Sequence, residues 1–241
     1  VAIRLDPKDP VAYFDRATSL AEIPDRDRAL ADFDRALELD PKLAAAYVGR
    51  GRLHAARGEP AEALADYDRA VAADPRDPLA FFARAQARAG RRGYDAALAD
   101  YNQALSLDPS NALFHLSRGD LRRARGESAE AIDDFSRAIR LNSRLADAYD
   151  ARAAVAFDQG RHLDAIADFN KAMEAAPNDA AAHLGRATCL FELHEYVQSA
   201  EDYTRALELD PGLVAARYGR ARARAQNGDY IAAAADYDAV L

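Results

Sequence analysis

The chain has 241 residues, of which 50% are hydrophobic and 30% are charged, a composition that is typical of soluble chains with an extended core and that argues against disorder. Its formal net charge of −8 at pH 7 argues against general binding to nucleic acid phosphates, which requires a basic surface. The sequence has no apolar run near about 18 residues and only one cysteine, Cys189, which excludes a membrane span, internal disulfides and Cys-based zinc sites.

Seven arginines recur every 34 residues along the chain, and seven aspartates follow them in the same register, each 16 residues later. The arginines are Arg16, Arg50, Arg84, Arg118, Arg152, Arg186 and Arg220. The aspartates are Asp32, Asp66, Asp100, Asp134, Asp168, Asp202 and Asp236. A strict period of this length indicates one supersecondary unit that packs on copies of itself. We therefore predict a single elongated array without an internal boundary.

The register divides the chain into repeats. Residues 1–9 read as the tail of a preceding repeat, six complete repeats follow, and 214–241 is a partial seventh. The complete repeats are 10–43, 44–77, 78–111, 112–145, 146–179 and 180–213. The chain does not begin with Met, so we read it as a segment of a longer protein. The compartment stays open, with the cytoplasm slightly favoured, and the Arg-rich, Ala-rich composition suggests a GC-rich bacterial source.

Each repeat is predicted to be a helix, a short turn and a second helix. In residues 44–77, a run at helical spacings is formed by Tyr47, Arg50, Gly51 and His54, and Gly58 breaks it. A second helical pattern begins near Ala63 and ends at Asp74-Pro75, because proline disfavours helix for the residue before it and donates no backbone hydrogen bond. Such short helices are marginal alone, so they must stack on one another.

Three columns of residues are predicted to form the core. One small residue of each first helix and one of each second helix mark the closest contacts, and an aromatic ring in the second helix fills the space beside them. The small columns are Ala17, Gly51, Ala85, Gly119, Ala153, Ala187 and Ala221, and Ala29, Ala63, Ala97, Ala131, Ala165, Ser199 and Ala233. The aromatic column is Phe33, Tyr67, Tyr101, Phe135, Phe169, Tyr203 and Tyr237.

Two repeats depart from the pattern. In the first, Glu22-Ile23-Pro24 replaces the glycine turn, so an altered bend is expected there. In the last, Arg217 stands in a first-helix column that is Tyr, Phe or His in the other repeats, and we expect it to loosen the final helix pair.

Most of the 34-residue units have an aromatic residue, then small residues, and later Ala, Phe or Tyr, Ala and Pro. This pattern resembles the tetratricopeptide repeat family. The resemblance covers the six complete repeats and the partial units. It implies an all-α fold, an α-α superhelix or solenoid of antiparallel helix pairs, with the first helices on the concave face. The arginine column replaces the usual Leu. The resemblance does not extend to the carboxylate clamp of the chaperone-tail receptors or to the asparagine ladder of the O-linked N-acetylglucosamine transferases.

The arginine and aspartate columns are predicted to pair inside each helix pair or between adjacent pairs. We interpret these pairs as structural, because a ligand site has no reason to recur in every repeat beside the core aromatic.

No catalytic motif is present: the sequence has no GxGxxG, GxxxxGK, HExxH or GxSxG. The histidines fall in different parts of different repeats, and Cys189 lies at an ordinary helix position. We therefore predict no enzyme activity, no metal and no cofactor.

A row of side chains beside the core columns of the first helices is the candidate binding site. We call it the first-helix stripe, and the family resemblance places it on the concave face. Its residues are Val11, Phe14, Val48, Arg52, Leu79, Phe82, Gln86, Leu116, Asp120, Arg123, Asp150, Phe157, Leu184, Phe191, Tyr218 and Arg222. A solvated wall does not need such apolar residues, so they indicate a bound peptide or helix. The alternative is that they pack helix on helix.

The predicted function is a non-catalytic scaffold that binds a protein or peptide partner along this stripe, with Arg52, Arg123 and Arg222 adding polar selection. One alternative is the regulatory or substrate-recruiting arm of a larger enzyme, such as a kinase or transferase, whose catalytic domain lies outside the sequence. Self-association through the terminal repeats is a third hypothesis.

Overall fold

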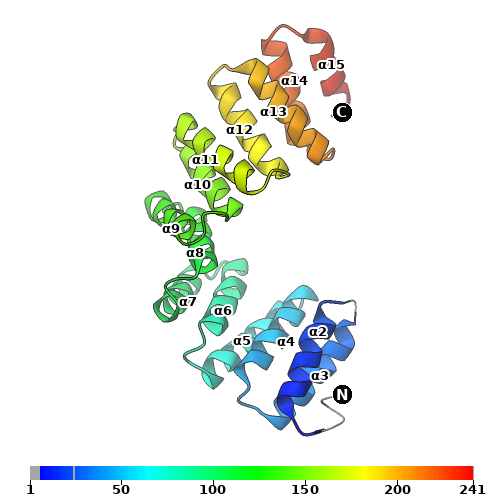
Figure 1. The fold of residues 1–241 in the computed structure, drawn as a ribbon, viewed down its shortest axis with the longest axis vertical. Coiled ribbons are helices and arrows are strands. Elements are labelled where there is room, and N and C mark those ends of the chain that lie inside the picture. The colour runs from blue at the N-terminus through cyan, green and yellow to red at the C-terminus, as the bar shows by residue number, and fades with distance from the viewer. Residues whose placement is uncertain (1–5, 24, 241) are drawn as a thin grey trace. The chain divides into compact units, whose positions relative to one another are not determined.

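The computed structural model describes residues 6–23 and 25–240, and over these residues it has fourteen α-helices and no strands (Figure 1). The predicted all-α fold is confirmed. The helices are α2 (Pro10–Ala21), α3 (Arg26–Leu39), α4 (Ala44–Ala56), α5 (Pro60–Ala73), α6 (Pro78–Gly90), α7 (Tyr94–Leu107), α8 (Ala112–Ala124), α9 (Ser128–Leu141), α10 (Ala146–Asp158), α11 (His162–Ala175), α12 (Ala180–Glu192), α13 (Tyr196–Leu209), α14 (Val214–Gln226) and α15 (Tyr230–Asp238). Residues 1–5 of the predicted tail at 1–9 lie outside the described residues.

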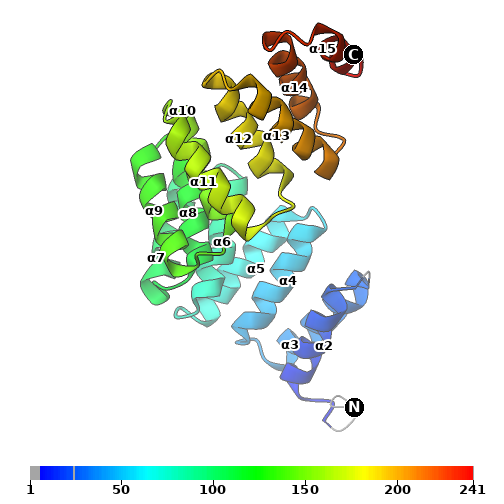
Figure 2. The same ribbon diagram turned by 45° about the horizontal axis from the view of Figure 1, so that its top comes forward.

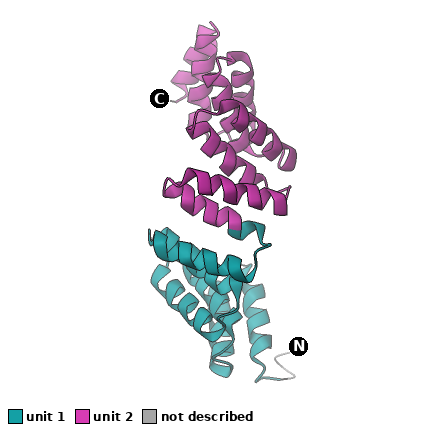
Figure 3. Cartoon of the chain, turned by 90° about the vertical axis from the view of Figure 1, so that its left-hand side faces the viewer, with its two compact units in different colours: residues 1–114 teal, residues 115–241 magenta. Residues whose placement is uncertain are grey.

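The residues group into two compact units, 1–114 and 115–241 (Figure 3). The division falls inside α8, and the 34-residue register runs through it without a change of spacing. Within the first unit, α2 packs on α3, α4 on α5 and α6 on α7. Within the second, α10 packs on α11, α12 on α13 and α14 on α15 (Figure 2). The short turns make the two helices of each pair antiparallel.

Most turns between paired helices need a residue with left-handed backbone. Gly58 has φ +75°, and three further glycines hold the same region at this register position. The first turn differs, as predicted, because the Asp25 N–H donates to the Ile23 carbonyl at 2.7 Å, whereas the equivalent Glu59 N–H donates to the carbonyl of His54. Pro24 itself lies outside the described residues.

The predicted core columns are confirmed: both small-residue columns are buried throughout, and the aromatic column is buried except at Tyr237. Several of the rings lie against glycine, either in their own repeat or in the next. A Cβ atom added to Gly51 would come within 2.6 Å of Tyr67, in the same repeat. A Cβ atom added to Gly49 would come within 2.6 Å of Phe33, in the preceding repeat. The rings therefore set the distance between consecutive helix pairs.

Candidate functional site

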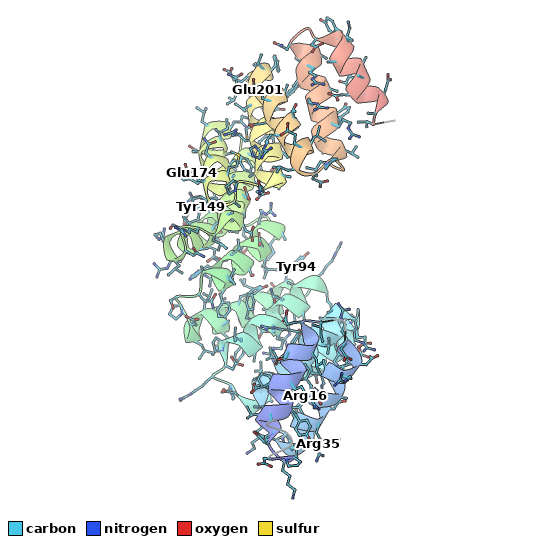
Figure 4. All side chains as sticks on the ribbon, turned by 45° about the vertical axis from the view of Figure 1, so that its right-hand side comes forward. Arg16, Arg35, Tyr94, Tyr149, Glu174 and Glu201 are labelled. Atoms are coloured by element: carbon cyan, nitrogen blue, oxygen red, sulfur yellow. The ribbon has the colours of Figure 1, made fainter. Side chains whose placement is uncertain are left out.

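All seven predicted arginine–aspartate pairs form, and each is bidentate inside its own helix pair. In the second repeat, Arg50 donates from Nε and Nη2 to the two carboxylate oxygens of Asp66, at 2.8 and 2.7 Å. The carboxylate is buried, with 3% of its side chain exposed. The hydrogen bonds to Asp66 raise the pKa of Arg50. Figure 4 labels Arg16, which makes the same pair on α2.

Five of these arginines also reach the second helix of the preceding repeat, through acceptors that lie outside the aspartate column. The remaining nitrogen, Nη1, of Arg50 donates to Asp34 at 2.6 Å, and that of Arg84 donates to Asp68 at 3.0 Å. Three repeats of the second unit use neutral acceptors at this position: Ser136 for Arg152, Asn170 for Arg186 and Thr204 for Arg220. Each of these arginines therefore links three helices, and all three of its guanidinium nitrogens already donate a hydrogen bond inside the fold.

Aromatic rings cover several of these guanidinium groups. The arginine lies over an aromatic ring three residues earlier, with guanidinium carbon to centroid distances of 5.4–6.0 Å for Tyr13, Tyr47, Phe81 and Tyr149. Arg217, in the same column, instead donates to the carbonyls of Ala239 and Pro211. The bond to Ala239 links α14 to the end of α15, and the expected loosening of the final helix pair stays a prediction.

A second arginine reinforces some pairs, which sequence reasoning missed. Arg88 and Arg224 lie one helical turn after the arginine column and donate to Asp100 and Asp236, at 2.8 and 2.7 Å. The only sequence signal was an arginine four residues after the column.

In the first unit, the first-helix stripe is partly surface and partly packing. Val11 and Leu79 are 48% and 46% exposed, and Arg52 and Gln86 are also exposed. Val48 lies in the core and has little surface to offer a partner.

The two phenylalanines of this part of the stripe pack against neighbouring rings. The Phe14 ring lies 6.2 Å from Phe33, and the Phe82 ring stacks on Phe114 at 4.6 Å. Both phenylalanines are half-buried, so part of each side chain stays exposed.

In the second unit, Leu116 is buried, Leu184 and Phe157 are half-buried, and Asp120 and Arg123 are exposed. The Phe157 ring lies 5.3 Å from His162. These positions again divide between helix packing and surface.

Two residues of the stripe, Phe191 and Arg222, meet between α12 and α14, and a third, Tyr218, lies one helical turn before Arg222. The Arg222 guanidinium lies 4.3 Å from the Phe191 ring, whose other neighbour is Tyr196 at 5.4 Å. Tyr218 is 49% exposed and lies 5.8 Å from Tyr237. These contacts leave an aromatic surface with a stacked cation on the first helices.

Asp150 is the acidic exception in a column that is apolar in the other six repeats. Its Oδ1 atom is buried and has no hydrogen-bond donor among the described residues. Burial, followed by the hydrogen bond and negative charge of Asp179, raises the pKa of Asp150 to about 8. Asp179 caps α12 by accepting from the Ala181 N–H at 2.8 Å.

The described residues contain no group of three or more His, Cys, Asp or Glu side chains placed to hold a metal ion. Burial raises the pKa of Cys189 to about 11, which keeps this thiol protonated and unreactive at neutral pH. Among the helices of residues 6–23 and 25–240, none combines the length and apolarity that crossing a membrane requires.

Comparisons with known proteins agree with this architecture. The family model "Tetratricopeptide repeat" matches residues 12–78, 151–214 and 193–241, which is more than half of the chain, and the model "TPR repeat" matches 93–122. No curated protein sequence matched.

Three solved structures illustrate the shared fold. PilF of Pseudomonas aeruginosa has a TM-score of 0.79 and 18% identity, covering 90% of this chain and 98% of its own. A chain of the APC/C hetero-tetramer Cut9-Hcn1 has a TM-score of 0.79 and 17% identity over 92% of this chain, which spans only 44% of that one. YrrB, described as a TPR protein with an unusual peptide-binding site, has a TM-score of 0.59 and 24% identity, covering 75% and 93%. The family model and the repeated helix pairs show that this chain belongs to the tetratricopeptide repeat family.

Proposed function

We propose that this chain is a non-catalytic protein-interaction scaffold that binds an apolar peptide or helix of a partner along the first-helix stripe. The observation that carries the proposal is the exposure of large apolar side chains on the first helices, at Val11, Leu79 and Tyr218. Exposed apolar surface of this kind is characteristic of recognition sites. Family membership supports the scaffold, and the peptide-binding site named for YrrB supports the peptide.

Arg52 is the proposed polar contact in the first unit. It is exposed, and no ion pair engages it among the described residues, whereas Arg50 and Arg57 on either side of it bind carboxylates. A free guanidinium beside apolar anchors adds orientation and selectivity through hydrogen bonds to a partner's carboxylate or carbonyl groups.

The test begins with peptides selected on the wild-type chain from a displayed library of random sequences. Titration of a selected peptide should show binding weakened about tenfold or more by Leu79→Asp, because a charge replaces an apolar anchor. Arg52→Glu should weaken peptides that carry a carboxylate. Leu116→Asp is unsuitable, because Leu116 is buried and its replacement would test folding.

The matched control is Ala61→Asp, an exposed change on α5 at a register position that is naturally Asp27 and Asp95 in two other repeats. Circular dichroism establishes that each variant is folded. Failure to select any peptide, or equal affinity of Leu79→Asp and wild type for every selected peptide, would refute binding at the stripe.

A further inference from the structure

Large aliphatic side chains are exposed at the start of three successive second helices in the second unit. Leu163 on α11, Val197 on α13 and Ile231 on α15 are 72%, 51% and 88% exposed. Each is the second residue of its helix and occupies the same position of the 34-residue register. We call these three residues the second-helix stripe. A folded chain gains no stability from apolar surface that stays in water.

The fold does not require these residues. The same register position holds Asp27, Ala61, Asp95 and Ala129 in the other repeats, and these residues are exposed as well. This register position is therefore exposed in every repeat, but only three consecutive repeats have a large aliphatic side chain there.

The second-helix side of this unit also has room for a partner's side chains. The backbone of first helix α12 lies close to both α10 and α14, whereas over the described residues the backbones of α11, α13 and α15 do not approach one another as closely. Val197 borders an open hollow of about 480 Å³ whose other lining residues include Thr204, Arg224 and Asn227.

The surroundings of Leu163 and Val197 are acidic. Residues 146–213 carry thirteen Asp and Glu against five Lys and Arg. Asp164 follows Leu163 directly, Glu195 lies two residues before Val197, and both acidic side chains are exposed. Figure 4 labels Glu201, which is exposed one helical turn after Val197. The arginines near Leu163 and Val197 are engaged by other groups. Arg161 donates to Gln159 and Asp164, and Arg205 and Arg224, which line the hollow beside Val197, donate to Glu208 and Asp236.

We propose that the second-helix stripe is a further docking surface, for a partner segment that presents apolar side chains flanked by lysine or arginine. The aliphatic side chains supply the buried contact, and the acidic rim selects the cationic flanks. Two other occupants fit poorly. A second copy of the chain would bring the same acidic rims face to face, and an anionic membrane surface would repel them.

The experiment uses a synthetic amphipathic peptide of leucine and lysine and a counterpart with glutamate in place of every lysine. Fluorescence anisotropy measures both against the 241-residue chain and the triple variant Leu163→Gln, Val197→Gln, Ile231→Gln. The replaced side chains are exposed, so folding should be retained. The leucine–lysine peptide should bind the triple variant about tenfold more weakly than wild type, because three apolar contacts are lost. The glutamate peptide should not bind.

The control is the double variant Ile23→Gln, Val214→Gln, which removes apolar side chains that are 51% and 57% exposed outside the stripe and should bind as wild type does. If the triple variant binds the leucine–lysine peptide as tightly as wild type does, the binding depends on charge alone and the proposal is wrong. Three results would overturn the proposed occupant. They are equal binding of the glutamate peptide, a dimer in ultracentrifugation that the triple variant abolishes, and binding of the chain to phosphatidylserine vesicles. A loss caused by Leu79→Asp and not by the triple variant would place the peptide on the first-helix stripe instead.

Discussion

Asp150 shows how one residue can make the stability of a repeat depend on pH. Its column is apolar in the other six repeats, at Phe14, Val48, Phe82, Leu116, Leu184 and Tyr218. The carboxyl lies near Asp179, and its pKa is raised to about 8, mainly by burial. Because this pKa lies above that of an unfolded aspartate, the folded state holds the proton more tightly than the unfolded state between the two values.

The stability contributed by Asp150 is therefore fully present below about pH 4 and is lost as the pH rises through about 8. Asp150→Asn removes this loss, so it should raise the free energy of unfolding at pH 8 by about 1–2 kcal/mol, after allowance for solvent screening, and by less at pH 5. Chemical denaturation followed by circular dichroism at both pH values measures the difference. Asp158→Asn, at an exposed position of the same helix, is the control, and an equal gain at pH 5 and 8 would contradict the titration of Asp150.

The arginine column makes a second prediction for single residues. Arg50→Ala leaves the buried carboxylate of Asp66 without its bidentate partner, so it should lower the free energy of unfolding by about 3 kcal/mol. Arg52→Ala removes an exposed arginine two residues away and should change the free energy of unfolding by less than about 0.5 kcal/mol. Denaturant titration compares the two variants. Similar small losses in both would show that the pair is dispensable.

Pairs of helices are spaced by rings that fit against glycine. At Gly185 on α12, an added Cβ would lie 2.2 Å from Cζ of Phe169 on α11, which is closer than real atoms approach. The ring is buried and cannot move without shifting its neighbours. The glycine therefore fixes how closely α12 approaches the preceding second helix.

Gly185→Ala should lower the free energy of unfolding by about 1–3 kcal/mol, because the methyl group overpacks this contact. Gly90→Ala is the matched control, since it lies at the end of α6 and an added Cβ meets nothing within 4 Å. The control should be neutral or stabilising by about 0.5–1 kcal/mol, because alanine favours helix. Thermal unfolding would contradict this packing argument if both substitutions shifted the melting temperature in the same direction.

At the scale of the whole molecule, each unit has cores of its own. Phe33 and Leu53 belong to one cluster in the first unit, and Tyr149 and Phe169 belong to one in the second. Within each unit, helices contact only their near neighbours along the chain. Stability in such an array is close to a sum of local terms.

Arg50→Ala should therefore raise amide hydrogen exchange mainly in α3, α4 and α5, which the arginine links, and leave α12, α13 and α14 unchanged. Exchange followed by mass spectrometry resolves these helices, with Arg52→Ala as the reference. A uniform increase across both units would show that the chain opens as one cooperative body.

Much of the architecture could be predicted because its signals repeat. A ring such as Tyr67 or an arginine such as Arg50 returns at the same interval, so one helix pair explains every other. The candidate site could be predicted only as a face, since periodicity gives the side of a helix and not the depth of a side chain. Val48 and Leu79 both fall on the predicted stripe, yet one is buried and the other is 46% exposed.

The sequence by itself determined the helix pairs, their register, the core columns and the arginine–aspartate pairs, because each depends on spacing along one chain. Only the tertiary structure decided the third contact of Arg50, with Asp34 of the preceding repeat, and the raised pKa of Asp150, because the first joins two repeats and the second comes mainly from burial. It also decided which apolar side chains stay in water at the second-helix stripe. Packing between repeats sets burial, and burial determines which surface is left for a partner.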